Sequence, residues 1–562
     1  MTPLSPLHYA YTHTVTEATT GYFSCEPDPA LPLEAALVRL EAAPMDEFLH
    51  RAALRDMCAL PEESLRQRAA AAGDRPVLAA LVQECALLTP AVADLYDAEL
   101  ARALSEHTPL AYLRWSLNAD RDLHRAWSAA FAANIVEHHT LPHPEEEDIP
   151  PLYAPQALPQ EADAPSVEAI RAALLATPAP AWERPPSQET ATKALAALVD
   201  NGIVASVEMR HEASLSPIAL LRRWQLDVAV RNGALNYTLR GEATTYGRGL
   251  SVADARASYA MEMVERASAY ASVDEGGIVG CTRAMPLFRA RYSELLAEGR
   301  AALDPNLLPL ETPYADQPLY WLEAEEAGGG GGCVLAPAQS VYLFCNLDEP
   351  ALSLAPGSTG LASGNSLAEA KAAALVEIIE RDAEATVPYD RSRCFTLRST
   401  DAKVQSLLDD YAARGIHVQF MDITSELGIP CYQCFVMGRK GTVHRATGAG
   451  LWGARAALAA MTEVPYPYPN GPASGPALRG LPERVLEELP DYRMESPTRQ
   501  VQLLEAVLAA HGRRPLYVEL TREDLEFPVV RALVPGLELN PEPDAFSRIR
   551  PRVYAGYTRL FR

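Results

Sequence analysis

An eighteen-residue pattern occurs twice in this chain, at residues 249–266 and again at residues 364–381. The two copies align without a gap and are identical at eight of the eighteen positions. Each copy begins with a glycine, continues with helical spacing and ends in Glu-x-x-Glu-Arg. Because glutamates three apart lie on one face of a helix, the pattern predicts two related helices with acidic faces. The duplication favours a site to which both helices contribute.

The composition limits the class of protein. At 562 residues the chain exceeds what one hydrophobic core normally supports, so we expect at least two domains. With 48% hydrophobic and 22% charged residues, it is typical of a soluble globular protein. A formal net charge of -24 argues against a general nucleic-acid binder or a binder of anionic membranes, since either needs a basic surface.

Location and redox state follow from the same kind of reasoning. The N-terminal residues lack the basic and apolar regions of a signal peptide, and no apolar segment is long enough to span a membrane. We therefore expect a cytoplasmic protein. Nine cysteines are few for this length and odd in number, which indicates reduced and mostly buried thiols rather than a disulfide framework.

Three regions differ in their residue patterns. Residues 1–142 are expected to form an all-α N-terminal domain, because residues 33–139 are rich in Ala, Leu, Arg and Glu with helical spacing. Residues 143–182 gather proline and acidic residues and are interpreted as a linker with one short helix near residues 166–176. Residues 183–562 alternate β-branched segments with helices, so the predicted fold class is α+β, with a mixed α/β second domain.

Strands are predicted within this last region, at residues 203–209, 236–244, 334–344, 417–423, 431–437 and 516–520. The five consecutive glycines at residues 328–332 are interpreted as a surface insertion without chemistry of its own.

The duplicated helices are more apolar than a solvated ion-pair helix requires. A single Glu-x-x-Glu-Arg most often forms an ion pair on a helix surface. Here the glutamates are separated by Met263-Val264 and Ile378-Ile379, so we expect the helices to be largely buried. Buried carboxylates need cations or protons. Four of them on two helices therefore predict a negative pocket that is stable around a metal ion or a ligand-bound cation.

Oxygen ligands favour a hard cation such as Mg²⁺, which uses one or two carboxylates per ion and completes its shell with water and phosphate oxygens. That chemistry suits a nucleoside triphosphate. Arg266 and Arg381 would then meet phosphate groups directly, because a guanidinium matches phosphate geometry.

Several ordered motifs resemble those of the YcaO family. They are residues 246–250 leading to Glu262 and Glu265, residues 358–371 running into 377–383, residues 422–425 with 428–430, and residues 516–521 followed by 534–537. The resemblance covers about residues 183 to 540 and does not extend to the predicted N-terminal helices.

The resemblance implies an ATP-dependent enzyme that phosphorylates a backbone amide oxygen of a peptide or protein after an internal nucleophile or sulfide has attacked the amide. The products in this family are azolines, amidines or thioamides. It also implies a mixed α/β catalytic domain with internal repeats, in which ATP lies in a Mg²⁺-filled pocket rather than on a glycine-rich loop. The candidate partners are the peptide or protein substrate, a sulfur-delivery or leader-peptide-binding protein, and a second copy of the chain.

By motif, the resemblance also assigns site residues. The Mg²⁺ ligands would be Glu262, Glu265, Glu377 and Glu380. The ATP-binding residues would be Thr190, Ser258, Arg266, Asn365, Arg381 and Glu463.

A third element departs from the family pattern. Residues 450–463 repeat the thirteen-residue offset from glycine to glutamate, but Ala459 stands where the family has an arginine, and the polar residues that usually follow are replaced at residues 464–469. Loss of one phosphate-binding arginine weakens ATP binding by about 1.5 to 3 kcal/mol, the usual worth of a charge-assisted hydrogen bond. Arg455, one helical turn earlier, is the candidate to compensate.

Two readings of the function remain open. Azoline-forming members tend to end in a proline-rich tail that enters the active site, whereas this chain ends in residues 555–562 without one, which favours thioamide formation or another amide activation. The alternative is a non-catalytic scaffold that binds a peptide or partner through its N-terminal helices. Ala459 favours the scaffold, and the two intact acidic helices favour the enzyme.

Two further clusters carry weaker signals. Cys431 and Cys434 have redox-motif spacing but fall in a predicted strand, where their side chains face opposite sides, so we favour buried thiols. His138, His139 and His143 have the chemistry of transition-metal ligands but lack a second cluster with ligand spacing, so we favour a solvated helix end.

Overall fold

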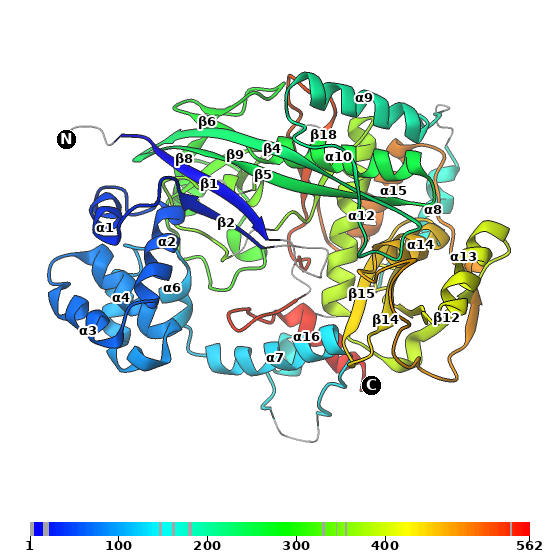
Figure 1. Ribbon diagram of the computed structural model, residues 1–562, viewed down its shortest axis with the longest axis horizontal. Helices are drawn as coiled ribbons and strands as arrows, with labels where there is room; N and C mark the ends of the chain where they lie inside the picture. Colours follow the sequence, from blue (N-terminus) through cyan, green and yellow to red (C-terminus); the bar gives the residue numbers. More distant parts are fainter. Residues whose placement is uncertain are drawn as a thin grey trace.

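The computed structural model shows three sheets with helices packed against them (Figure 1). It describes residues 5–14, 22–144, 149–159, 163–177, 182–328, 332–343, 346–354, 357–539 and 542–561. Within these residues no helix is both long and apolar enough to cross a membrane.

The first sheet is built on a long hairpin. Strands β4 (Ile218–Asn232) and β5 (Leu235–Gly249) pair antiparallel along their whole length, joined by a tight turn at Gly233, which has a φ of 56°. The second half of β4 alternates strictly between buried and exposed residues, which is the pattern of a strand with one face in the core. This signal is present in the sequence, although β4 is not among the predicted strands.

The N-terminal region contains strands, which corrects the expectation of an all-α beginning. Strand β1 (Leu7–Thr14) pairs parallel with β5, and β2 (Tyr22–Pro27) pairs antiparallel with β1. Tyr9 and Tyr11 are buried two residues apart, which is strand periodicity, whereas the helical pattern starts only at Leu33. These strands therefore belong to the same sheet as the later hairpin.

The remaining N-terminal residues are helical, as their spacing predicts. The helices are α1 (Leu33–Ala42), α2 (Glu47–Cys58), α3 (Glu62–Ala71), α4 (Pro76–Leu88), α5 (Ala98–Leu104), α6 (Tyr112–Ser116) and α7 (Arg121–Glu137). The apolar residues of α1 to α6 share one continuous core with β4 and β5, whereas those of α7 pack with α16 (Pro551–Arg559). The division of the chain at residues 143–182 stays a prediction, but the structure gives the N-terminal helices no separate core.

The predicted linker contains the expected short helix. It is α8 (Val167–Leu175), capped by the Ser166 side chain and packed on α15 (Pro497–Ala510). Residues 145–148, 160–162 and 178–181 lie outside the described residues, as do residues 329–331 of the glycine run.

The second sheet has the order β10-β9-β17-β18-β11, with β8 paired to β9, and the third has the order β15-β14-β13-β12-β16. The second sheet contains β8 (Phe288–Ala290), β9 (Leu319–Glu326), β10 (Cys333–Pro337), β11 (Leu361–Ser363), β17 (Leu516–Glu519) and β18 (Val529–Leu533). The third contains β12 (Cys394–Arg398), β13 (Gln419–Asp422), β14 (Cys431–Met437), β15 (Val443–Ala449) and β16 (Glu483–Val485). Short strands β3 (Met209–Arg210), β6 (Ser272–Asp274) and β7 (Gly277–Val279) complete the first.

Most of the predicted strands are confirmed. Residues 431–437 form β14, and the predictions at residues 236–244, 417–423 and 516–520 overlap β5, β13 and β17. Residues 334–344 are extended only as far as Pro337, after which a 3-10 turn begins. Residues 203–209 do not form the predicted strand, since only Val204 and Met209 make strand pairings there.

Each sheet carries one copy of the repeated helix. Helix α10 (Val252–Ala269) follows β5 and packs on the first sheet, α12 (Leu367–Thr386) follows β11 and packs on β18, and α14 (Gly453–Glu463) follows β15 and packs on the third sheet. Figure 1 shows the three helices meeting on one side of the molecule, with α9 (Ser187–Asp200) lying beside α10. The remaining helices are α11 (Tyr292–Ala297), α13 (Ala402–Ala413) and α16 (Pro551–Arg559), of which α16 packs on α12.

Glycine contacts support the equivalence of the first and third copies. A Cβ on Gly247 of β5 would lie 1.9 Å from the backbone oxygen of Ala255 on α10, and a Cβ on Gly448 of β15 would lie 2.3 Å from that of Ala456 on α14. In both copies, the helix residue whose backbone comes this close lies eight positions after the strand glycine. Only glycine permits it.

Candidate active site

The glutamates of the duplicated helices are anchored by backbone amides of neighbouring strands and loops. Tyr246 N donates to Glu262 Oε2 at 3.1 Å, and Gly360 N donates to Glu377 Oε2 at 3.0 Å. These two glutamates occupy equivalent positions, and each accepts from the segment that leads into its own helix. Glu380 differs, because its Oε2 accepts from Ala449 N of the third sheet at 2.8 Å. That bond ties α12 to β15.

Arginines neutralise part of this acidic surface. The Arg266 guanidinium lies 2.9 Å from Glu265 and 3.7 Å from Glu262. On α12, Arg381 lies 2.8 Å from Glu380 and 2.6 Å from Glu384, so it is shared between two carboxylates. On α10 the arginine thus reaches the first glutamate of the motif, as the spacing predicts, whereas the ion pairs of Arg381 are with Glu380 and Glu384.

The electrostatics show that the two helices and α14 converge. Burial raises the pKa of Glu265 to about 8, against the opposing charge of Arg266, and the negative charge of Glu377 on α12 raises it further. Burial also raises the pKa of Glu380 to about 8, against Arg381, with Glu463 of α14 adding to the rise. Glu463 likewise contributes to the raised pKa of Glu262. The carboxylates of α10 and α12 therefore lie close enough to one another and to Glu463 for their charges to interact.

These carboxylates are not sealed from solvent. The side chains of Glu262, Glu265 and Glu380 keep 31%, 15% and 12% of their surface exposed. They are surrounded by protein on most sides, which explains their raised pKa values, yet a small ligand can reach them.

The donor set fits Mg²⁺ coordinated together with phosphate. Within the described residues no three Asp, Glu, His or Cys side chains already converge in the manner of a closed metal site. Mg²⁺ does not require one, since it usually takes one or two carboxylates and completes its octahedron with water and phosphate oxygens. The negative potential of clustered carboxylates raises their affinity for protons and for hard divalent cations alike, so a bound Mg²⁺ would replace protons there.

Two of the predicted nucleotide-binding residues, Thr190 and Asn365, lie at the N-terminal ends of α9 and α12. Thr190 of α9 is buried, and its hydroxyl donates to Asn365 Oδ1 at 2.9 Å. The Asn365 side chain in turn donates to Glu369 Oε2 at 2.9 Å, which fixes its orientation. Ser258 lies exposed on α10, one turn before Glu262. The structure therefore brings Thr190 and Asn365 together.

Arg455 lies at this same end. Burial lowers its pKa, and the nearby positive charge of Arg184 lowers it further, whereas Glu369 and Asp254 act in the opposite direction. Arg455 is therefore a neighbour of the Asn365 end, while Glu463 belongs to the acidic cluster at the other end of α14. Whether it compensates for Ala459 stays a prediction.

Comparison with known proteins identifies the family. A family model described as a YcaO cyclodehydratase that binds ATP and Mg²⁺ matches residues 246–466 and 465–538, more than half of the chain. The chain belongs to the YcaO family. All three copies of the repeated helix lie inside the matched region, so the acidic cluster lies in a domain of a family that binds ATP and Mg²⁺.

Individual relatives are distant. An uncharacterized protein of Methanothermobacter thermautotrophicus is 28% identical over 338 residues, which make up 54% of this chain and 84% of that protein. A heterocyclase solved in complex with substrate and cofactor is 18% identical, with a TM-score of 0.49 over 65% of this chain, and this chain covers 55% of its length. The YcaO protein of Methanopyrus kandleri bound with AMPPCP and Mg²⁺ is 20% identical, with a TM-score of 0.46 over 65% of this chain and 94% of that chain.

A cavity of about 1150 Å³ adjoins the acidic cluster of the YcaO domain. Glu262 and Arg266 form part of its wall, and β2, the loop at residues 357–359 and the N-terminal end of α16 form other parts. Helix α16 lies alongside α7, where Trp127, Phe131, Tyr554 and Tyr557 form one apolar cluster (Figure 1). The YcaO domain and the N-terminal helices thus enclose the cavity together.

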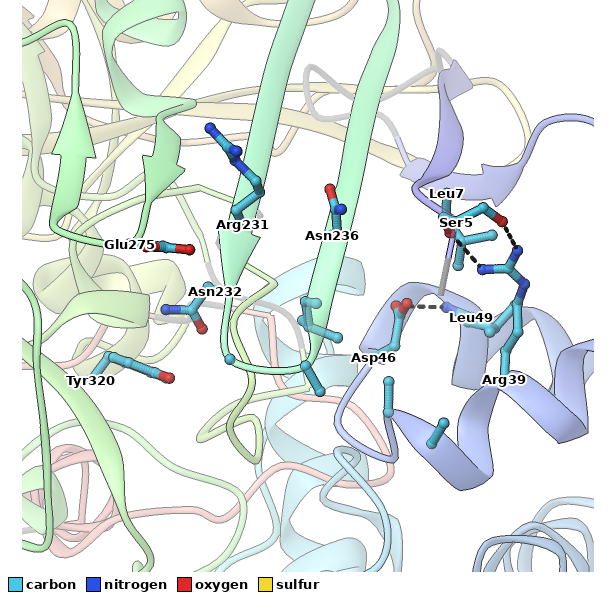
Figure 2. A pocket seen from close by; sticks show the side chains of 15 residues that line it. Ser5, Leu7, Arg39, Asp46, Leu49, Arg231, Asn232, Asn236, Glu275 and Tyr320 are labelled. Carbon is cyan, nitrogen blue, oxygen red and sulfur yellow. Dashed lines mark hydrogen bonds between the residues drawn. The ribbon is translucent and has the colours of Figure 1, made fainter. Parts of the chain in front are cut away.

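A second cavity, of about 600 Å³, lies between α1, the loop before α2, and the turn of the β4–β5 hairpin (Figure 2). Its buried Asp46 accepts hydrogen bonds from Tyr9 at 2.6 Å, from Leu49 N at 3.2 Å and from Asn346 at 3.0 Å. Arg39 donates to the Ser5 backbone and hydroxyl. These groups satisfy one another, and none of the predicted site residues lies there.

Sequence reasoning missed three charged residues near the cluster. Glu384 lies one turn after Glu380 on the same helix face, which was a readable signal. Arg445 of β15 lies 2.5 Å from Glu384 and 2.6 Å from Glu542. No local sequence pattern predicts either contact. Arg531 is the one charged residue of β18, and a charge inside an apolar strand is a signal of buried polar chemistry.

Of the weaker candidates, the two cysteines and His138 are packing residues, whereas His139 and His143 are exposed as predicted. Cys431 and Cys434 are both fully buried and belong to different apolar clusters, so they face opposite sides of β14 as predicted. The solvated helix end is wrong for His138, whose ring stacks on Tyr389 at 4.1 Å and hydrogen-bonds Gln433 at 3.0 Å.

Proposed function

We propose that this protein uses Mg-ATP to phosphorylate a backbone amide oxygen of a peptide or protein, giving a thioamide or an azoline-type product. One observation carries the proposal. Carboxylates from three helices, each packed on a different sheet, gather beside a cavity that Glu262 lines, and their charges help to raise the pKa values of Glu262, Glu265 and Glu380. Such a cluster is costly to fold unless it binds cations.

The roles of the residues follow from their positions. Glu262 and Glu265 on α10, with Glu377 and Glu380 on α12, would hold Mg²⁺, which supplies charge neutralisation for the phosphates. Once these carboxylates bind a cation, Arg266 and Arg381 are released from their present partners and can donate to phosphate oxygens. Thr190, Ser258 and Asn365, with Glu463 at the acidic end, would complete the nucleotide pocket.

The substrate peptide would occupy the cavity of about 1150 Å³. The wall includes apolar side chains such as Phe23 and Phe131, together with the backbone of β2, the outermost strand of its sheet among the described residues. An extended peptide placed there brings an amide next to Glu262 and Arg266. The N-terminal helices thus contribute to substrate binding.

Apart from Mg²⁺, which is not consumed, the reaction requires only a nucleophile and ATP. The nucleophile adds to the amide carbon, the amide oxygen forms a bond to the terminal phosphorus, and the bond from that phosphorus to ADP breaks. The carbon–oxygen bond then breaks as phosphate leaves, and the nucleophile, and for a ring product also the amide nitrogen, gives up its proton to solvent, which leaves a C=S or C=N double bond. Sulfide gives a thioamide, for which a sulfur-delivery protein is the expected partner, and a Cys, Ser or Thr side chain gives an azoline.

Calorimetry with Mg-ATP tests the proposal. Wild-type protein should bind Mg-ATP, and the double variant Glu377→Gln/Glu380→Gln should lose most of that binding. Glu62→Gln, in an exposed ion pair of α3 with Arg66, is the matched control and should bind as the wild type does. A wild type without Mg-dependent ATP binding would instead support the scaffold that Ala459 favours.

Mass spectrometry then distinguishes the products. Incubation with Mg-ATP and candidate peptides encoded nearby should give a mass loss of one water for an azoline, or the gain from exchange of oxygen for sulfur when sulfide is supplied. If the protein binds Mg-ATP but the peptides show neither mass change, both product classes are contradicted.

A further inference from the structure

Arg531 is a buried charge in the middle of a strand. Its side chain is only 6% exposed, and its backbone pairs with Leu361 of β11 on one side and Val518 of β17 on the other. The other residues of β18 are valine, alanine and leucine. A guanidinium is rarely placed in such a strand, because burying a charge is costly unless it is paired.

The protein itself only partly satisfies this side chain. Both terminal nitrogens of Arg531 donate to the carbonyl oxygen of Gly357, at 3.1 Å each. Its Nε is buried and has no hydrogen-bond partner. Across the described part of the chain Arg531 forms no ion pair, whereas Arg266 and Arg381 each contact carboxylates directly.

The charge of Arg531 persists at neutral pH. Burial lowers its pKa to about 10, Glu377 opposes that change, and the positive charge of Arg266 adds to it. The side chain therefore stays protonated where it lies. A protonated, buried guanidinium with an unused donor needs an anion.

The surroundings of Arg531 indicate where that anion would lie. Arg531 has Glu265 and Glu377, two of the proposed Mg²⁺ ligands, as electrostatic neighbours. It also lines the cavity of about 1150 Å³, together with Glu262 and Thr359. It therefore sits where the acidic cluster opens into the proposed peptide cavity, which is where the terminal phosphate and the amide must meet.

We propose that Arg531 binds the phosphoryl group that passes from ATP to the amide oxygen. This assignment rests on the proposed function. As the bond between the terminal phosphorus and ADP breaks and the bond to the amide oxygen forms, the three remaining phosphoryl oxygens keep their negative charge. The Nε and Nη donors of Arg531 are arranged to bind two of them. The group contacted is the phosphate that ATP has and ADP lacks.

Nucleotide binding by Arg531→Gln tests the assignment. Calorimetry would measure Mg-ATP, Mg-ADP, and Mg-ADP with aluminium fluoride, which mimics a phosphoryl group in transfer. Mg-ADP affinity should stay within about twofold of the wild type, while affinity for Mg-ATP, for the aluminium fluoride complex, or for both should fall by at least about tenfold. A loss confined to the aluminium fluoride complex would locate the contact in the transition state, and a loss with Mg-ATP would locate it in the ground state. Arg531→Lys keeps the positive charge but not the paired donors of the guanidinium, so it should lose less affinity than Arg531→Gln.

Controls separate this assignment from folding and from the proposed function. Arg548 lines the same cavity but already has a bidentate partner in Asp120, at 2.9 and 2.7 Å, so Arg548→Gln should leave the ratio of ATP to ADP affinity unchanged. Thermal unfolding of each variant reports on folding. Unchanged binding of all three ligands by Arg531→Gln, or an equal loss of ATP and ADP affinity, overturns the assignment alone. A folded wild type that binds none of the three overturns the proposed function and the assignment with it.

Discussion

Replacement of Glu380 by glutamine should stabilise the protein in the absence of Mg²⁺, although it removes an ion pair with Arg381. Burial raises the pKa of Glu380 from 4.5 to about 8, against Arg381 and with the help of Glu463. Between these two values the folded protein holds a proton that the unfolded chain has released. The free energy of unfolding therefore falls as pH rises from about 4.5 to about 8.

The magnitude follows from the pKa values. Linkage gives a destabilisation of about 3 kcal/mol at pH 7 and about 1 kcal/mol at pH 5, relative to a side chain that never ionises. Glutamine is such a side chain, and its amide oxygen can still accept the bond from Ala449 N that Glu380 accepts at 2.8 Å. Urea denaturation without Mg²⁺ should show Glu380→Gln gaining up to about 3 kcal/mol at pH 7 and less at pH 5. With saturating Mg-ATP the order should reverse, because only the wild type gains binding free energy.

Glu384 provides the opposite control on the same helix. Although burial acts to raise it, Arg381 and Arg445 hold the pKa of Glu384 below its usual value. Glu384→Gln should therefore destabilise the protein at pH 7 under the same conditions. If Glu380→Gln is less stable than the wild type at pH 7 without Mg²⁺, the ion pair outweighs the repulsion between carboxylates and the reasoning fails.

Three further substitutions test other parts of the site. Ala459→Arg should tighten Mg-ATP binding by roughly tenfold or more in calorimetry, since it restores a charge-assisted hydrogen bond worth about 1.5 to 3 kcal/mol; unchanged affinity would show that the third helix does not face phosphate. Gly448→Ala places a Cβ 2.3 Å from a backbone oxygen of α14 and should lower the free energy of unfolding by about 1 to 3 kcal/mol, whereas Gly450→Ala, whose nearest neighbour would lie at 3.9 Å, should be tolerated. Thr190→Val removes the 2.9 Å hydrogen bond to Asn365 and should weaken Mg-ATP binding several-fold, whereas Thr190→Ser should bind nearly as the wild type does. Equal Mg-ATP affinities of the two variants would argue against a role for the hydroxyl.

Local pattern was enough to find the acidic helices. Residues 252–269 and 367–386 are helical as the repeat predicts, and in both the serine two residues after the glycine caps the helix. Helical spacing indicates which charged residues lie close together within each copy, and their roles in binding Mg²⁺ and ATP stay predictions. The buried thiols of β14 follow from strand periodicity in the same way.

Other features depend on contacts between distant segments. The pairing of β1 with β5 joins residues more than two hundred positions apart, and nothing within residues 7–14 specifies that partner. Arg445 lies on strand β15 and Glu384 on helix α12, about sixty residues earlier, yet their charged groups lie 2.5 Å apart. Periodicity describes which face of an element is apolar, but not which other element covers that face.

The sequence by itself determined that two acidic helices and a third, altered copy exist, and which carboxylates and arginines they carry, because these depend on spacing along one helix. Only the tertiary structure decided that each copy lies on its own sheet and that Glu265, Glu380 and Glu463 come close enough to raise pKa values. It also decided that Arg531 is buried beside them without an ion pair among the described residues. Charge interactions depend on distance in space, and that distance is set by how the three sheets pack together.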